Sequence, residues 1–144
     1  MSDPLSVASA LIGIVTATVQ ASKALYDTVQ SFKNHPRKVR QLKEELEALN
    51  LVLQSLRTLV DHDASTLTVL ELPLKRCQQA CLDFRTIILK CCAHSGGSRT
   101  SFRDWATLRY MDSDIAEFTN MLAGYKSTIA IALGDANLLV LTSG

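Results

Sequence analysis

Apolar residues recur at steps of three and four along almost the whole chain, and this period constrains the fold more than any other feature. It is clearest in the second quarter of the sequence, where the steps alternate without a miss at Val39, Leu42, Leu46, Leu49, Leu53, Leu56 and Val60. A period near 3.5 residues keeps one helix face turned toward a partner, as in bundles and coiled coils. No segment alternates apolar and polar residues as a strand does. The sequence therefore predicts an all-α fold, a bundle of four to five helices.

Turn signals divide this helical pattern. Asn34-His35-Pro36 predicts the end of a first helix near residue 32, and residues 61–65 interrupt the pattern again. The third helix either kinks at Pro73 or begins near Leu72 after a short turn. Gly96-Gly97 marks a loop within residues 94–98.

The last helical pattern runs from about residue 101 toward residue 141. Asp112-Ser113-Asp114 can start a new helix within it, after a short helix that contains Trp105. The apolar tail over residues 138–141 indicates either a longer parent chain or docking on the bundle. With 144 residues, the chain is long enough for one domain with its own core, and we expect residues 1–144 to form it.

The stretch from Pro4 to Ser22 carries no charge over nineteen residues. As a helix it would be roughly 28 Å long, which is close to the thickness of a bilayer core. It can therefore cross a membrane or serve as the central helix of a bundle. It is no secretory signal, because the chain begins Met-Ser-Asp-Pro without a positive charge. We expect the protein to stay in the cytosol.

Small residues share one face of this first helix, and bulky residues cover the others. The small residues are Ser6, Ala10, Gly13, Ala17, Ala21 and Ala24, and the bulky ones are Leu5, Leu11, Ile12, Ile14, Val15 and Val19. Such a stripe lets helix backbones approach closely. Its ordinary interpretation is that the first helix nests among its neighbours in a resting bundle. The alternative is self-association within a membrane.

Five cations follow this helix within eleven residues that contain no acid: Lys33, Arg37, Lys38, Arg40 and Lys43. Their ordinary interpretation is a solvated turn. Their position behind an apolar helix also favours contact with anionic lipid headgroups, which would keep this end on the cytosolic side. A net charge of +1 and the lack of interleaved aromatic residues argue against nucleic acid as a partner.

Catalytic and cofactor signals are weak. No G-x-x-x-x-G-K-[ST] loop occurs, and the cysteines lack the paired spacing of a zinc site. We expect no enzyme activity, cofactor or metal. Cys77 and Cys81 fit buried apolar positions, while Cys91 and Cys92 leave reversible acylation open.

An ordered series of segments covers nearly the whole chain and resembles a known family. The segments are MSDPLSVASALIGIV with TVQASKALYDTVQSF, then VRQLKEELEALNLVLQSL, LPLKRCQQACLDF and MLAGYKSTIAIALGDANL. They are similar to the N-terminal domain of fungal STAND proteins, which are NLR-like receptors. This domain is also called HeLo-like or the azaphilone-cluster protein L N-terminal type. The resemblance implies a helical signalling bundle at the N-terminal end of a larger receptor.

In related domains, activation releases the N-terminal apolar helix, which enters the membrane and kills the cell. Carried onto this chain, the resemblance implies that the segment from Leu5 to Val19 inserts, with Gly13 and the small stripe in self-association. The expected function is a non-enzymatic effector of programmed cell death or immunity that oligomerises and moves from the cytoplasm to the plasma membrane. The expected partners are further copies of the chain, anionic lipids and other HeLo-like domains.

The alternative is a homotypic adaptor module without membrane activity. In that case the apolar seams of the second and last helices would make the contacts. The seam of the second helix is Leu42, Leu46, Leu49, Leu53 and Leu56.

Overall fold

A computed structural model of the chain describes residues 4–31, 37–94 and 112–143. These residues form four α-helices and one short 3-10 helix. In chain order they are α1 (Pro4–Gln30), α2 (Arg37–Asp63), η1 (Ser65–Leu70), α3 (Glu71–His94) and α4 (Asp112–Ser143). No strand occurs in the described parts of the chain. The predicted all-α bundle is confirmed.

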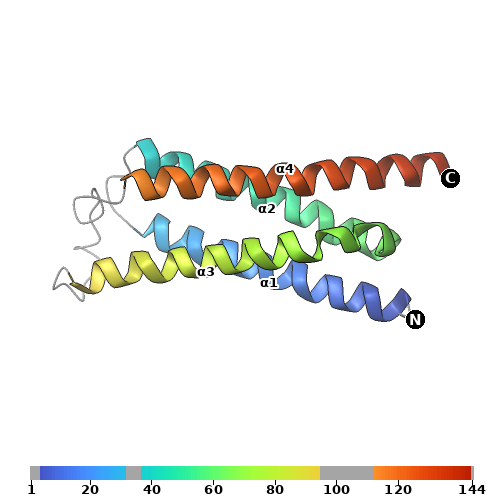
Figure 1. Cartoon of the computed structure of the whole chain (residues 1–144), viewed down its shortest axis with the longest axis horizontal. Helices are drawn as coiled ribbons and strands as arrows, with labels where there is room; N and C mark the ends of the chain where they lie inside the picture. The colour runs from blue at the N-terminus through green and yellow to red at the C-terminus, as the bar shows by residue number, and fades with distance from the viewer. Residues whose placement is uncertain (1–3, 32–36, 95–111, 144) are drawn as a thin grey trace.

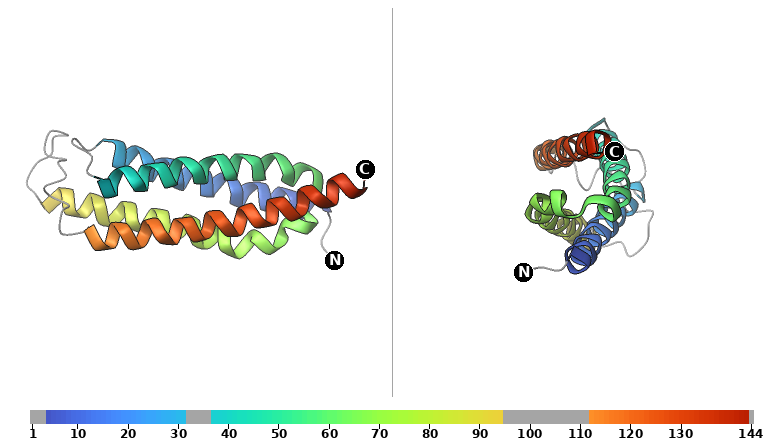
Figure 2. Two further views of the ribbon diagram at one scale, coloured as in Figure 1. Left: turned by 90° about the horizontal axis from the view of Figure 1, so that it is seen from above. Right: turned by 90° about the vertical axis from the view of Figure 1, so that its right-hand side faces the viewer.

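The four α-helices lie side by side along one long axis and alternate in direction (Figure 1). α1 packs against both α2 and α3, and α4 packs mainly against α2. α3 and α4 make far fewer contacts with each other than these three pairs do. The order around the bundle is therefore α3, α1, α2 and α4, and the view along the axis shows α3 and α4 on its open side (Figure 2).

The periodic leucines of α2 form the centre of the core. Five of them are almost fully buried: Leu42, Leu46, Leu49, Leu53 and Leu56. The same period places α4 side chains in the core at Ile115, Phe118, Leu122, Ile129 and Ala136. Burial of a leucine side chain contributes about 1.5–3 kcal/mol, so these rows account for much of the bundle's stability.

Between α2 and α3 the chain turns through η1. The Leu67 amide donates a hydrogen bond to the Ala64 carbonyl at 3.1 Å, and the Glu71 amide donates to Thr68. Pro73 lies in the first turn of α3, where its missing N–H breaks no hydrogen bond of the helix. The third helix thus begins after a short turn and is not interrupted at Pro73.

α4 begins at Asp112, as the Asp112-Ser113-Asp114 signal predicts. The helix continues through residues 138–141 to Ser143, and its end reaches past the other helices (Figure 1). The backbone of the apolar tail therefore does not turn back onto the bundle. The predicted helix around Trp105 and the Gly96-Gly97 loop lie outside the described residues.

Candidate functional site

The inward face of α1 is held between α2 and α3. Leu11, Val15, Leu25 and Val29 are buried in the common core. Ile12, Ile14 and Val19 are half-buried against the same core, while the side chain of Leu5 lies outside the described ones. The expected packing of α1 into the bundle is confirmed.

Polar side chains interrupt this buried face where α1 meets α3. The Thr18 hydroxyl lies 2.8 Å from the Ile14 carbonyl and 3.2 Å from the Leu74 carbonyl of α3, so both oxygens compete for its one proton. The Thr28 hydroxyl accepts a hydrogen bond from Nε of Arg85, also in α3, at 3.0 Å. Contacts of this kind hold α1 against α3 with less apolar burial than an all-leucine interface would give.

Ser22 lies between these two threonines on the same face. Its Oγ is fully buried and has no hydrogen-bond partner among the described residues. A buried hydroxyl without a partner loses its hydration and gains no hydrogen bond in return. Ser22 therefore weakens the attachment of α1.

The outward face of α1 carries the first part of the small-residue stripe. Ala10 and Gly13 are exposed and Ala17 is half-buried, whereas Ala21 is buried. A Cβ added at Gly13 would meet no atom within 4 Å. The interpretation that the stripe nests among neighbouring helices is wrong for Ala10 and Gly13, while the side chain of Ser6 lies outside the described ones. The neighbours α2 and α3 lie on the other side, where larger side chains fill the contact.

Among the described residues, one helix is long and apolar enough to span a membrane. It is the Val7–Gln30 part of α1, with a mean hydropathy of 1.3, and 28% of its apolar window is buried inside the bundle. Core helices of soluble proteins also pass this test of length and composition. The exposed residues of this segment are small or polar, and its large apolar side chains are buried or half-buried.

The predicted cationic cluster is split by the structure. Arg37 and Arg40 are exposed at the start of α2, whereas Lys38 is half-buried and interacts within the protein. Nζ of Lys43 lies 5.8 Å from the centre of the Tyr26 ring, which is a cation–π contact. Lys33 lies outside the described residues. Of the five predicted cations, Arg37 and Arg40 are therefore the ones that the structure shows as exposed and able to contact an anionic surface.

Tyr26 joins this cluster to a cleft between α1 and α2. Its hydroxyl donates a hydrogen bond to Glu47 at 2.8 Å, and this bond raises the pKa of Tyr26 above its ordinary value. The cleft has a volume of about 430 Å³ and is lined by Lys23, Tyr26, Asp27, Glu47, Asn50 and Leu51. Sequence spacing does not indicate this cleft, because the residues of its two walls lie at least twenty positions apart in the chain.

The seam of α2 is fully used inside the bundle. Its five leucines have essentially no exposed surface, so in this fold they cannot also contact a second copy. Homotypic contacts through the seam, which the adaptor alternative requires, are therefore incompatible with the bundle as it stands.

The cysteines of α3 behave as apolar core residues. Cys77 and Cys81 are buried, and a hydrogen bond between them together with burial raises the pKa of the Cys81 thiol. A protonated, buried thiol is a poor nucleophile and a poor metal ligand. Within the described ranges no three His, Cys, Asp or Glu side chains gather where they could hold a metal ion. The side chains of Cys91 and Cys92 are not described.

Comparisons with known proteins give one match. A family model described as pigment biosynthesis cluster protein PigL N-terminal matches residues 2–143. No curated protein and no solved structure matches the chain.

Proposed function

This chain belongs to the family described as pigment biosynthesis cluster protein PigL N-terminal, and we propose that it is a non-enzymatic effector domain that oligomerises and targets membranes through α1. It acts as the signalling module of a fungal NLR-like protein of immunity or programmed cell death. It rests in the cytoplasm and moves to the plasma membrane on activation.

The observation that carries this proposal is the apolar length of α1. α1 contains the one stretch among the described residues that is long and apolar enough to span a bilayer. From Val7 on, its large apolar side chains are buried or half-buried, so insertion requires α1 to leave the bundle. Ala10 and Gly13 on its outward face leave room for the backbone of another helix. A second copy of α1 or a membrane would each cover this surface.

The charges at the other end of α1 fit the same topology. Arg37 and Arg40 are exposed in the first turn of α2, which begins at the end of the bundle opposite to the N-terminus of α1 (Figure 1). Each cation near an anionic membrane surface contributes about 1 kcal/mol of binding. With α1 inserted from its N-terminus, these arginines stay with the cytosolic headgroups.

A homotypic interaction module without membrane activity is the second candidate. Because the α2 seam is buried, such a module would use another surface, and we assign its contacts to the outward face of α1 as well. Both candidates therefore make Gly13 a contact residue, and they differ in whether a membrane is involved.

Gly13→Glu tests the proposal without disturbing the core. No atom lies within 4 Å of the added Cβ, and any residue other than proline fits a helix interior at least as well as glycine. An acidic residue in the centre of a membrane helix costs about 2.5–3.5 kcal/mol, so we expect dye release from phosphatidylserine vesicles to fall about a hundredfold. Gly124→Glu in α4 is the matched control, because Gly124 is also exposed and also meets nothing within 4 Å.

Three outcomes separate the candidates. Loss of release with Gly13→Glu alone supports the membrane effector. Full release by Gly13→Glu, or an equal loss with Gly124→Glu, contradicts it. A wild-type protein that releases no dye but forms an oligomer sensitive to Gly13→Glu in light scattering supports the interaction module.

A further inference from the structure

The open side of the bundle contains an apolar groove between α3 and α4. It has a volume of about 380 Å³, within the range of ligand pockets, and is lined by Phe84, Ile87, Asp114, Glu117, Phe118 and Met121. The groove exists because α3 packs mainly on α1 and α4 packs mainly on α2. The interface between α3 and α4 is therefore incompletely closed.

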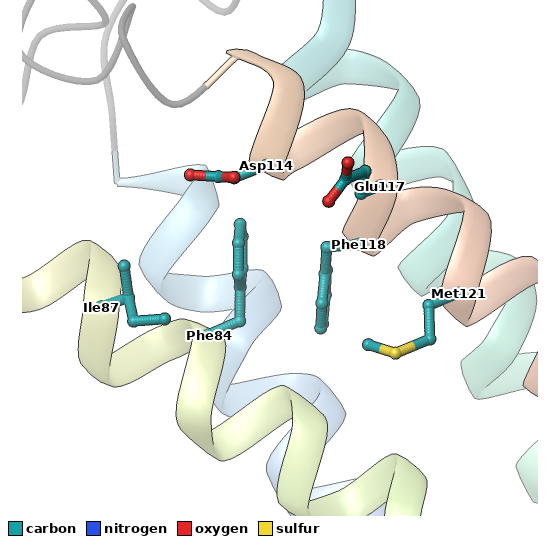
Figure 3. A pocket seen from close by; sticks show the side chains of 6 residues that line it. All are labelled: Phe84, Ile87, Asp114, Glu117, Phe118 and Met121. Carbon is teal, nitrogen blue, oxygen red and sulfur yellow. The ribbon is translucent and has the colours of Figure 1, made fainter.

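Two stacked phenylalanines form the floor of the groove. The rings of Phe84 and Phe118 have their centroids 4.2 Å apart and an angle of 4° between their planes, and both residues are largely buried. Figure 3 shows the rings facing each other across the seam, with Ile87 and Met121 on either side. This contact fixes the spacing of α3 and α4 at the groove and makes it a preformed feature.

The walls of the groove are apolar and exposed. Ile87 is 47% exposed and Met121 is 41% exposed, although both are large hydrophobic residues beside a buried aromatic pair. Methionine is flexible and polarisable, and it is frequent on surfaces that bind amphipathic helices. The apolar lining is thus suited to side chains entering from outside the bundle.

The rim of the groove is acidic. Asp114 and Glu117 are exposed, lie one turn apart on α4 and point over the groove (Figure 3). Neither carboxylate has an ion-pair partner within the described residues. An acidic rim repels anionic lipid headgroups and attracts cationic side chains.

We propose that the α3–α4 groove docks an amphipathic helix of a partner protein, with apolar anchors on one face and lysines or arginines beside them. The anchors pack on Phe84, Phe118 and Met121, and the cations pair with Asp114 and Glu117. This surface is separate from α1 and goes beyond the proposed membrane function.

A folded second copy fits the groove less well than such a helix. On α2 of a second copy, Arg37 and Arg40 are exposed, but the neighbouring apolar residues Val39 and Leu42 are buried in its own core. On α3, Leu72, Lys75 and Arg76 are exposed within one turn, but Lys75 already pairs with Glu71, so this face offers Arg76 to two carboxylates. The chemistry of the groove therefore favours a segment from another protein.

The test uses a fluorescein-labelled helical peptide of leucines at helical spacing with lysines beside them. The control peptide carries glutamates in place of the lysines. We expect the lysine peptide to bind with saturation in fluorescence anisotropy, and the glutamate peptide to bind at least about tenfold more weakly. Added salt is expected to weaken the lysine peptide's binding.

Substitutions in the groove locate the binding. Ile87→Ala with Met121→Ala, and separately Asp114→Asn with Glu117→Gln, should each raise the Kd by about tenfold. All four residues are exposed, so the variants are expected to fold, which circular dichroism verifies. Leu51→Ala and Glu44→Gln, at exposed positions of α2, are the matched controls and should leave the Kd unchanged.

Four results would overturn the proposal. The first is equal binding of the glutamate peptide, and the second is an equal effect of the α2 controls. The third is binding that appears only after residues 95–111 are replaced by a Gly-Ser linker, which would make the chain's own connection the occupant. A concentration-dependent dimer that Met121→Ala abolishes would likewise assign the groove to a second copy.

Discussion

Single polar residues on the buried face of α1 determine how firmly this helix is held. Thr18 and Thr28 find partners in α3, at the Leu74 carbonyl and at Arg85. Ser22, between them, is equally buried and has no partner among the described residues. A hydrogen bond to a buried threonine raises the free energy of unfolding by about 1 kcal/mol, and a buried serine without a partner lowers it by about as much.

Ser22→Ala is expected to stabilise the protein. The substitution removes a buried hydroxyl that makes no hydrogen bond, and alanine is the better helix former by about 0.5 kcal/mol. The free energy of unfolding, measured by urea denaturation, should rise by about 1–2 kcal/mol. Ser127→Ala in α4, at an exposed position, controls for helix propensity and should add only about 0.5 kcal/mol. A Ser22→Ala variant no more stable than Ser127→Ala would show that Ser22 is satisfied in solution.

These residue contacts lie beyond the reach of sequence patterns. In the sequence, Thr18 and Ser22 only dilute the hydrophobicity of the first helix. The bond between Arg85 and Thr28 joins residues 57 positions apart, and nothing local to either residue indicates it. Which polar side chain gains a partner depends on how two helices are set against each other, and periodicity does not specify that.

At the scale of the element, α2 is the helix whose role the sequence specifies best. Its apolar residues occupy one stripe with polar residues elsewhere, so only one face can be buried. The structure buries that stripe. α1 is the opposite case, because apolar residues cover several of its faces and the period does not say which face turns inward. The sequence therefore leaves the side of the small-residue stripe open, and the structure exposes Ala10 and Gly13.

Alanine substitutions at two leucines of α2 test which face of the helix is buried. Leu53 is fully buried and Leu51 is 66% exposed, although both lie in the middle of the same helix. Leu53→Ala should lower the free energy of unfolding by about 2–5 kcal/mol, because it removes core contacts and leaves a cavity. Leu51→Ala should change it by less than about 0.5 kcal/mol. Similar losses in urea denaturation would contradict the assignment of the buried face.

At the scale of the whole molecule, the order α3, α1, α2, α4 gives each outer helix one main neighbour. α3 holds α1 from one side, while α4 packs on α2 at the opposite edge. The sequence predicts four long helices but not this order, since each amphipathic helix can pack on any other. The order matters for function because it makes the α1–α3 contact separable from the α2–α4 contact.

Two core leucines distinguish release of α1 from general destabilisation. Leu74 in α3 and Leu122 in α4 are both fully buried, and the Leu74 carbonyl contacts Thr18 of α1. Either Leu→Ala change should cost about 2–5 kcal/mol of stability. If α1 must leave the bundle to enter a membrane, Leu74→Ala is expected to lower the cost of that step more than Leu122→Ala, because α3 packs mainly on α1 and α4 mainly on α2. Each reduction of 1.4 kcal/mol in the free energy of releasing α1 raises the population with released α1 about tenfold, as long as that population stays small.

We therefore expect Leu74→Ala to release dye from phosphatidylserine vesicles at least several-fold faster than the wild type. Leu122→Ala should stay near the wild-type rate at a temperature where both variants are folded by circular dichroism. Adding Gly13→Glu to Leu74→Ala should remove the gain, because the released helix then carries a charge into the bilayer. Equal acceleration by the two alanine variants would mean that loss of overall stability, and not separation of α1 from α3, controls membrane entry.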